Sequence, residues 1–389
     1  MSDIAIEFKN VVKTYTNGFK AVDNLNLQIR QGEICVLIGP SGCGKTTSMR
    51  MINRLIAVTG GQILADGDDI ADVSPETLRR KMGYAIQQIG LFPHMTVGQN
   101  IAVVPRLLKW DQERIARRVD ELLELVGLNA DAYRDMYPRQ LSGGQQQRVG
   151  VARALGADPP ILLMDEPFGA VDPITRATLQ SEFLQIQTTV GKTIVFITHD
   201  IDEAIKMGDR IAVMRDGHLV QHDSPDTLLA HPVDRFVRDF VGADRQLKRL
   251  GLVPIRDLMN TVPPRLYIDE TLDEAVSVMS QHGVKSAFVI DRDTGILRGW
   301  IDRESTRHGG TSLIEAMHEG SFHDIAVREN ATAREALSAM VARGFRVTPV
   351  VDRLGRLVGS ISLETLQDLA LYGASNDLNN DDTKRDDRS

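Results

Sequence analysis

The residues with the clearest capacity for chemistry form one loop, which reads Gly39-Pro40-Ser41-Gly42-Cys43-Gly44-Lys45-Thr46-Thr47. The loop matches the spacing G-x-x-x-x-G-K-[ST], follows the apolar run 34–38, and precedes residues 48–55, which can continue as a helix. Its glycines let successive backbone N–H groups face an anion, and the start of the following helix adds a positive dipole. Lys45 would reach the β- and γ-phosphates of a nucleotide, and the Thr46 hydroxyl would ligate Mg²⁺. The competing interpretation, a glycine-rich turn with a surface lysine, leaves the flanking strand and helix unexplained.

Two carboxylates end a second stretch. Residues 161–164 are apolar, and Asp165 and Glu166 follow them directly. This pattern is typical of a buried parallel strand whose C-terminal end delivers side chains to the ligand-binding edge of a sheet. Asp165 would hold Mg²⁺, largely through water, and Glu166 would orient or deprotonate the attacking water. The alternative is a strand that ends in a solvated turn.

A histidine follows another apolar run, at residues 193–197. A lone histidine is more often structural than catalytic. However, His199 would lie at the same sheet edge as Glu166, within reach of a γ-phosphate. His199 is therefore the second catalytic candidate.

A serine and two glycines open a further helix, in the pentapeptide Leu141-Ser142-Gly143-Gly144-Gln145. Such a helix start can face a phosphate, although alone it could be an ordinary capped helix. Its distance from Lys45 along the chain argues against a second loop for the same phosphates, and therefore indicates dimerisation. Asp172 would lie in an interface loop or would simply cap a helix over residues 174–186.

The remaining elements position these groups. Alternating apolar residues predict two strands between residues 4 and 29. Tyr15 lies between these strands and would either stack on an adenine or pack against neighbouring side chains. Gln87 ends a strand at residues 82–86, where a glutamine is usually solvated, and the apolar segment 91–97 after it could meet a partner. A helix is expected from Asp111 to Val126, and a D-G hairpin near residues 211–220.

The composition of the chain indicates how many domains it has and which classes of protein it can belong to. The chain has 389 residues, a net charge of -8, and 42% hydrophobic residues, which suggests two or three globular domains and argues against a general nucleic-acid binder. No apolar run approaches the roughly 18 residues of a membrane span, and the N-terminus lacks a basic region followed by an apolar one. We therefore expect a cytosolic protein. Its two cysteines, Cys35 and Cys43, make a disulfide framework unexpected.

Residues 4–242 resemble the nucleotide-binding subunit of ATP-binding-cassette (ABC) transporters. The resemblance implies an α/β fold, that of a P-loop NTPase with a helical subdomain, with ATP and Mg²⁺ as cofactors. In that family the Ser142 to Gln145 signature of one protomer closes over ATP held by the phosphate loop of the other, so two ATP molecules lie in a head-to-tail homodimer. Gln87 matches the glutamine that senses Mg²⁺ near the permease's coupling helix, His199 matches the switch histidine, and Asp172 matches the dimer-contact loop.

The sequences of residues 50–55, 86–96 and 105–110 are similar to those of the ATPase subunits of importers of glycine betaine, carnitine and choline. That resemblance implies transmembrane permease subunits, an indirectly associated solute-binding protein, and a peripheral location on the cytoplasmic face of the inner membrane. An importer of another solute, such as an amino acid or a polyamine, is the alternative. A soluble ABC protein that acts on nucleic acid or ribosomes would be expected to have two cassettes, a coiled-coil insertion or a basic stripe, and none is present.

The C-terminal third repeats itself after 61 positions. The recurring residues include Thr271 and Thr332, Glu274 and Glu335, and Met279 and Met340. Each unit predicts a helix, a strand, a turn and a second strand, and the pair resembles tandem cystathionine-β-synthase (CBS) domains. Such pairs often bind adenosyl ligands.

The usual ribose-binding Asp is missing from both repeats, because Ser362 is followed by Thr365, and Asp302 by Ser305. A nucleotide ligand, a sensor of ionic strength near a membrane, and a structural contact therefore all stay open. A further hypothesis for the whole chain is that the CBS half is a nucleotide sensor that acts by controlling the cassette.

The predicted division of the chain has four parts: a cassette at 1–242, a linker at 243–256, two CBS repeats at about 257–310 and 311–371, and a disordered tail at 372–389.

Overall fold

The computed structural model describes residues 3–85, 90–169, 171–308, 312–320 and 322–371. The chain divides into two compact units. The first contains residues 1–228 and 232–241, and the second contains residues 229–231 and 242–389. Each unit has its own sheets and its own apolar core.

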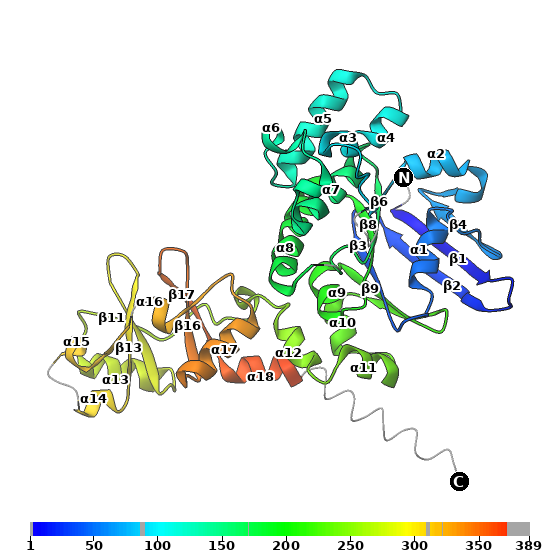
Figure 1. Ribbon diagram of the computed structural model, residues 1–389. Coiled ribbons are helices and arrows are strands. Elements are labelled where there is room, and N and C mark those ends of the chain that lie inside the picture. The colour runs from blue at the N-terminus through cyan, green and yellow to red at the C-terminus, as the bar shows by residue number, and fades with distance from the viewer. Residues whose placement is uncertain (1–2, 86–89, 170, 309–311, 321, 372–389) are drawn as a thin grey trace, which may run out of the picture. The chain divides into compact units, whose positions relative to one another are not determined.

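The first unit is built on a six-stranded sheet of order β10-β9-β3-β8-β7-β6 (Figure 1). The strands are His218–Asp223, Arg210–Arg215, Ile34–Ile38, Thr193–Ile197, Ile161–Asp165 and Met82–Ala85. All neighbours are parallel except β9 and β10, which form the predicted hairpin around Asp216 and Gly217. Every residue of β3 and β8 is buried, as expected for central parallel strands. The carboxyl ends of these strands therefore share one edge.

A second, antiparallel sheet of order β2-β1-β4-β5 completes the strand part of this unit. Its strands are Lys20–Arg30, Ile4–Thr14, Gly60–Ala65 and Asp68–Asp69. Leu25, Leu27 and Ile29 of β2 are buried and alternate with exposed residues, which confirms the predicted period of two. One apolar cluster joins this sheet, helix α1 and the central sheet, and includes Phe8 and Met49.

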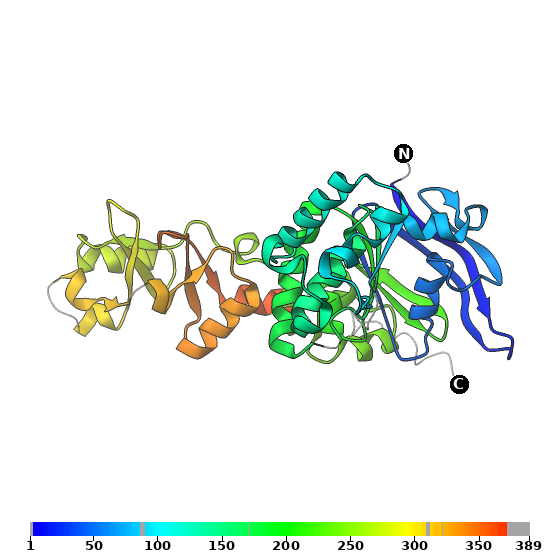
Figure 2. The ribbon, with the colours of Figure 1, turned by 45° about the horizontal axis from the view of Figure 1, so that its top comes forward.

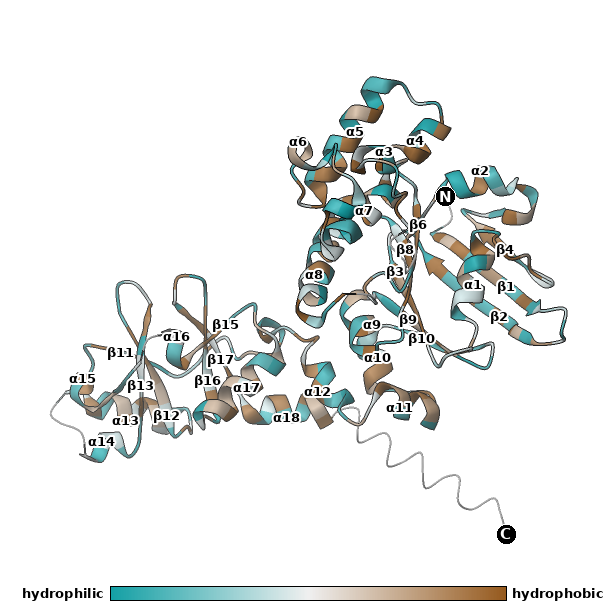
Figure 3. Ribbon diagram, in the orientation of Figure 1, coloured by the Kyte–Doolittle hydropathy of each residue, from teal (hydrophilic) through white to brown (hydrophobic). Residues whose placement is uncertain are grey.

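Helices surround the sheets of the first unit, and α3 to α7 gather in a cluster that is separate from β1 and β2 in both views (Figure 1 and Figure 2). Helix α5 begins after Asp111, whose carboxylate accepts from the N–H of Arg114, as the sequence predicted. It carries both teal and brown residues in Figure 3, and its apolar side packs on α7. The helices are α1 Lys45–Ile52, α2 Pro75–Arg80, α3 Val97–Ile101, α4 Val103–Leu107, α5 Gln112–Leu125, α6 Ala130–Tyr133, α7 Gly143–Leu155, α8 Pro173–Val190, α9 Ile201–Met207, α10 Pro225–Ala230 and α11 Arg235–Val241, with short 3₁₀ turns at Ile70–Asp72 and Pro138–Gln140.

The second unit contains two similar halves. Thr271 caps α13 and Thr332 caps α17, each in a reciprocal capping box with the glutamate three residues later, which confirms the internal repeat. The elements are α12 Arg245–Leu250, β11 Arg265–Tyr267, α13 Leu272–Gln281, β12 Ser286–Ile290, β13 Leu297–Asp302, α14 Ser305–His308, α15 Leu313–Ala316, β14 His318–Glu319, α16 Phe322–Ile325, β15 Val327–Arg328, α17 Ala333–Arg343, β16 Val347–Val351, β17 Leu357–Ser362 and α18 Leu363–Leu371, with a 3₁₀ turn at Ile255–Asp257.

The two halves are joined by reciprocal backbone bonds. The N–H of Leu297 donates to Gly355 at 3.0 Å, and the N–H of Leu357 donates to Gly295 at 3.1 Å. An apolar cluster that contains Phe288 of one half and Val351 of the other also joins the two halves. In the sequence repeat, Gly295 corresponds to Gly355 and Leu297 to Leu357, so the two bonds are equivalent.

Helix α12 lies inside the stretch 243–256 that the sequence predicted as a linker. Leu250 and Ile255 are buried in the core of the second repeat, among residues of α17 and α18. This stretch is therefore folded into the second unit. The basic residues around Leu250 suggested a linker, but its apolar residues cover a helix pair.

Candidate nucleotide-binding site

The phosphate loop joins β3 to α1, as its sequence context predicted. The ammonium group of Lys45 donates to the carbonyls of Gly39 at 2.7 Å and Pro40 at 3.1 Å, and Lys45 is only 8% exposed. The cation is therefore held on the inside of the loop by the loop's own backbone. A bound phosphate would supply the counter-charge that two neutral carbonyls do not.

Two glycines of the loop have no room for a side chain. Gly39 has a φ of +150°, and a Cβ there would lie 2.1 Å from the carbonyl oxygen of Met214. Gly44 has a φ of +103°, and a Cβ there would lie 2.5 Å from the carbonyl oxygen of Ala21. The close approach of loop and sheet thus depends on glycine at both positions.

A hydroxyl and a carboxylate converge beside the loop. The Thr46 hydroxyl lies 3.5 Å from Oδ1 of Asp165, the last residue of β7. Burial raises the pKa of Asp165, and the nearby Arg50 partly offsets this shift. Oxygen ligands of this kind, together with phosphate oxygens and water, suit Mg²⁺. Thr46 and Asp165 thus lie together as predicted, and no group of three or more His, Cys, Asp or Glu side chains gathers as a metal site in the described ranges.

Arg50 was missed by the sequence analysis. It lies one helical turn after Thr46 on α1, and its charge acts on both Asp165 and Tyr84. The spacing of four residues from Thr46 was a usable signal, because such residues share a helix face.

Glu166 and His199 lie together at the carboxyl edge of the sheet, as predicted. Strands β7 and β8 pair in parallel with Asp165 opposite Ile197, which brings the two following segments side by side. The Nδ1 atom of His199 lies 3.4 Å from Oε2 of Glu166, and the His199 side chain is 66% exposed. Glu166 adopts a left-handed φ of +46°, and its N–H donates to Ile197 at 3.0 Å. Strain of this kind collects at functional sites.

The signature residues form the start of α7. The Ser142 hydroxyl accepts from the N–H of Gln145, and the Gln145 side chain accepts from the N–H of Ser142, in a capping box. An adjacent cavity of about 310 Å³ is lined by Ser142, Gly144 and Gln145, and by no residue of the phosphate loop. A Cβ added at Gly143 would meet no atom within 4 Å, so the outward side of this residue is open.

The other predicted site residues have simpler surroundings. Asp172 caps α8 by accepting from the N–H of Thr175, which confirms the helix-capping interpretation and does not test the interface one. Tyr15 is 38% exposed, and the Lys13 ammonium lies 5.3 Å from its ring centroid, so the stacking on an adenine stays a prediction. Gln87 lies outside the described residues.

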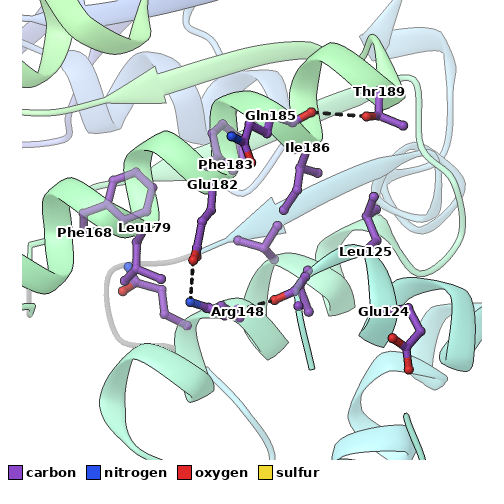
Figure 4. A pocket seen from close by; sticks show the side chains of 14 residues that line it. Glu124, Leu125, Arg148, Phe168, Leu179, Glu182, Phe183, Gln185, Ile186 and Thr189 are labelled. Carbon is purple, nitrogen blue, oxygen red and sulfur yellow. Dashed lines mark hydrogen bonds and ion pairs between the residues drawn. The ribbon is translucent and has the colours of Figure 1, made fainter. Parts of the chain in front are cut away.

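A larger cavity of about 350 Å³ lies between α5, α7 and α8 (Figure 4). Across this cavity, Arg148 on α7 forms an ion pair at 2.7 Å with Glu182 on α8. The lining contains none of the predicted site residues. The ion pair therefore links the signature helix to the helix that Asp172 caps.

In the second unit, the polar residues at the adenosyl-type positions bond to each other. Asp302 accepts from both the N–H and the hydroxyl of Ser305, at 2.8 and 2.9 Å, and the Ser362 and Thr365 hydroxyls lie 2.9 Å apart. Nε2 of His318 lies 2.9 Å from the Ser305 hydroxyl. Ser362 also accepts from the N–H of Thr365 at 3.1 Å, so these polar side chains are hydrogen-bonded within their own repeats.

Comparison with known proteins gives the family. The ABC transporter family matches residues 22–169, and the CBS domain family matches residues 255–305 and 321–371. The choline transport ATP-binding protein OpuBA of Bacillus subtilis is 47% identical over 381 residues, which are 96% of this chain and 99% of that protein. The chain belongs to the ATP-binding subunits of ABC transporters.

A second transport protein and a solved structure are also similar to this ABC ATPase. The osmoprotectant import ATP-binding protein OsmV of Salmonella typhimurium is 47% identical over 95% of this chain and 97% of its own. A solved dimer of an ATP-binding cassette in a post-hydrolysis state, bound to ADP and Pi, is 36% identical, with a TM-score of 0.50 over 56% of this chain and 98% of that one. The predicted fold class and family are therefore confirmed, and cassettes of this family dimerise. No helix in the described part of the ABC ATPase is both long and apolar enough to cross a membrane.

Proposed function

We propose that this ABC ATPase energises an importer of quaternary ammonium osmoprotectants, such as glycine betaine, carnitine or choline. The likeness to OpuBA and OsmV extends over nearly the whole chain, including the C-terminal repeats, and both relatives are named for such solutes or for osmoprotectants in general. The chain's own solute preference would be set by the permease and binding-protein partners, which would contact the solute directly.

The hydrolytic step rests on one observation, the approach of His199 Nδ1 to Glu166 Oε2 at the phosphate-loop edge of the sheet. Glu166 would orient the attacking water and accept its proton, while His199 would hold the Glu166 carboxylate on one side and meet the γ-phosphate on the other. Lys45 and the loop N–H groups would hold the β- and γ-phosphates. Mg²⁺ held by Thr46 and Asp165, and sensed by Gln87, would neutralise charge that develops on the phosphate oxygens.

A homodimer would complete the site. Ser142, Gly143, Gly144 and Gln145 of one protomer would close over the ATP bound by the other, with Tyr15 stacked on its adenine. Asp172 would then lie at the contact between protomers. The open outward side of Gly143 supports this assignment, because an approaching phosphate meets no side chain there.

The subunit would act at the cytoplasmic face of the inner membrane, bound to transmembrane permease subunits that receive solute from a binding protein. The segment from Gln87 to Thr96 would contact the permease. The cassette would occupy residues 1–242 and the CBS repeats about 257–371. The CBS pair would regulate turnover, and an adenosyl ligand is the less favoured regulator, because Asp302 and Ser362 already accept hydrogen bonds from residues of their own repeats.

The proposal is tested by ATP hydrolysis in liposomes that contain the full chain, its co-purified permease subunits and its binding protein. Glycine betaine, carnitine, choline, spermidine and an amino acid are added in turn. Stimulation by a quaternary amine alone supports the proposal. Stimulation by spermidine or the amino acid would establish the alternative class of solute, and basal hydrolysis with no stimulation by a quaternary amine would overturn the assignment.

A further inference from the structure

One buried carboxylate of the first unit has no part in the chemistry described above. Glu203 lies on α9 and is only 8% exposed. Its Oε1 accepts a hydrogen bond of 2.9 Å from Nε2 of Gln180 on α8, a residue that is itself 6% exposed. The Thr198 hydroxyl also acts on this carboxylate as a polar partner and lowers its pKa, and the N–H of Glu203 donates to the Asp200 carboxylate at 3.2 Å. Glu203 therefore joins the helix α8 to the residue that directly precedes His199.

The bonds continue from Thr198 around His199. The Thr198 hydroxyl oxygen accepts from the N–H of Asp200 at 3.0 Å. The Asp200 carboxylate in turn accepts from the N–H groups of Asp202 and Glu203, at 2.9 and 3.2 Å. Both neighbours of His199 are thus fixed to the start of α9, whereas the imidazole itself projects with 66% exposure. The backbone on both sides of His199 is therefore held by hydrogen bonds, and the His199 side chain is exposed.

A second arm of the same network leads toward the dimer-contact loop. Nη2 of Arg176 donates to the carbonyl of Val171 at 2.9 Å, and its Nη1 lies 4.0 Å from the Asp200 carboxylate. Arg176 and Gln180 are four residues apart on α8 and therefore share one helix face. This face of α8 contacts the segment before Asp172 and the turn that carries His199.

The buried carboxylate of Glu203 has a desolvation cost that an apolar side chain would not have. Burial raises the pKa of Glu203, while its bonds to Thr198 and Gln180 lower it. A buried carboxylate needs such partners, and removing one of them leaves an unsatisfied group. An apolar residue at position 203 would pack against α8 without that cost. The polar choice fixes geometry rather than adding burial.

We propose that Glu203 is a positioning residue, which acts through Thr198 to hold His199 beside Glu166. Through Gln180 and Arg176 on α8, the same network also connects the turn of His199 to the dimer-contact loop at Asp172. The inference rests on the catalytic role proposed for His199. It adds the residues that set the ring's position, none of which needs to touch ATP.

The sharpest variant is Thr198→Val, because it removes one hydroxyl and keeps the side-chain shape. We expect kcat for ATP hydrolysis to fall about ten- to hundredfold, the scale of losses caused by small misplacements of a reacting group. The KM for ATP should change less than about twofold, because the phosphate loop is unaltered. The matched control is Thr188→Val on α8, whose exposed hydroxyl bonds only within its own helix, to Leu184, and which should leave both constants unchanged.

Glu203→Gln and Glu203→Ala test the acid itself. A glutamine keeps an oxygen that can accept from Thr198 and Gln180, so Glu203→Gln should retain most of kcat, whereas Glu203→Ala should lose it as Thr198→Val does. Equal activity of Glu203→Ala and the wild type, in protein with a normal thermal transition, would overturn the proposal. If Glu203→Ala fails to fold, Thr198→Val decides alone.

A double-variant cycle separates this inference from the function on which it rests. All measurements use the full chain with its co-purified permease subunits. If the network acts through His199, then Thr198→Val should reduce kcat less than about twofold in a His199→Ala background. Full additivity there would assign the network a purely structural role and overturn the proposal. Normal turnover of His199→Ala alone would instead remove the proposed role of His199, whereas a loss in His199→Ala with none in Thr198→Val would remove only the role of Glu203.

Discussion

The Nδ1 atom of His199 lies 3.4 Å from Oε2 of Glu166, although the two residues come from different strand ends. Their approach follows from the parallel pairing of β7 and β8, which aligns the carboxyl ends of both strands. Glu166 is one of the residues with a left-handed φ, so the backbone is held in an unfavourable conformation to place its carboxylate. An acid and an imidazole therefore meet at the same sheet edge as the phosphate loop.

Gly143→Asp should abolish ATP-driven dimerisation without disturbing the fold. A Cβ at this position meets no atom within 4 Å, and a carboxylate in the first turn of α7 is favourable for the helix dipole by about 0.3–1 kcal/mol. In the dimer, however, the carboxylate would face the partner's γ-phosphate. Sedimentation with ATP in a Glu166→Gln background should show monomers for Gly143→Asp and dimers for Gly143→Ala. Dimers of equal yield in both variants would argue against the signature contact.

Gly44→Ala should destabilise the first unit more than Gly42→Ala does. Both glycines have positive φ values, +103° and +80°, so each alanine costs about 1–2 kcal/mol in backbone conformation. Only the Gly44 substitution also places a Cβ 2.5 Å from the Ala21 carbonyl oxygen, which should add roughly 2 kcal/mol. Urea unfolding without nucleotide measures the difference. Equal losses for the two variants would show that the loop relaxes away from β2.

His222→Gln should make the first unit less sensitive to acid. Burial, with a contribution from Arg210, lowers the pKa of His222 to about 4, from an ordinary value of 6.5. The unfolded chain therefore binds more protons than the folded chain between these two values, so this group's stabilisation is present above pH 6.5 and is lost as the pH falls toward 4. The variant should avoid a loss of up to roughly 3 kcal/mol.

The control for this prediction is His218→Gln, on the same hairpin but with a side chain that is 54% exposed. Free energies of unfolding at pH 7, 6 and 5 should fall less for His222→Gln than for the wild type and the control. Parallel curves for all three proteins would contradict the role of the buried imidazole.

The parts of the structure that the sequence predicted well are those decided by neighbours along the chain. The start of α5 at Asp111 could be predicted because its capping bond lies within three residues, and β3 and β7 could be predicted because each is a continuous apolar run before a diagnostic turn. Helix α8 is longer than expected, because polar residues after Ile186 still fit the helix until Gly191, whose φ of +57° ends it.

The contacts that depend on packing between elements could not be predicted in this way. Gln180 and Glu203 are 23 residues apart, and their bond exists only because α8 lies against α9. The helix that occupies the expected linker depends likewise on the apolar surface of α17 and α18, which Leu250 covers. A sequence pattern shows that Leu250 needs burial but does not show where.

The role of Glu166 in hydrolysis is tested most directly by ATP binding and turnover in the variant Glu166→Gln. The full chain and its permease subunits are incubated with Mg²⁺ and ATP, and bound nucleotide, released phosphate and oligomeric state are measured together. We predict that the variant binds ATP as the wild type does, accumulates as an ATP-bound dimer, and loses at least about a hundredfold in turnover, within the usual range for general base catalysis. Near-normal phosphate release by a variant that binds ATP would contradict the account.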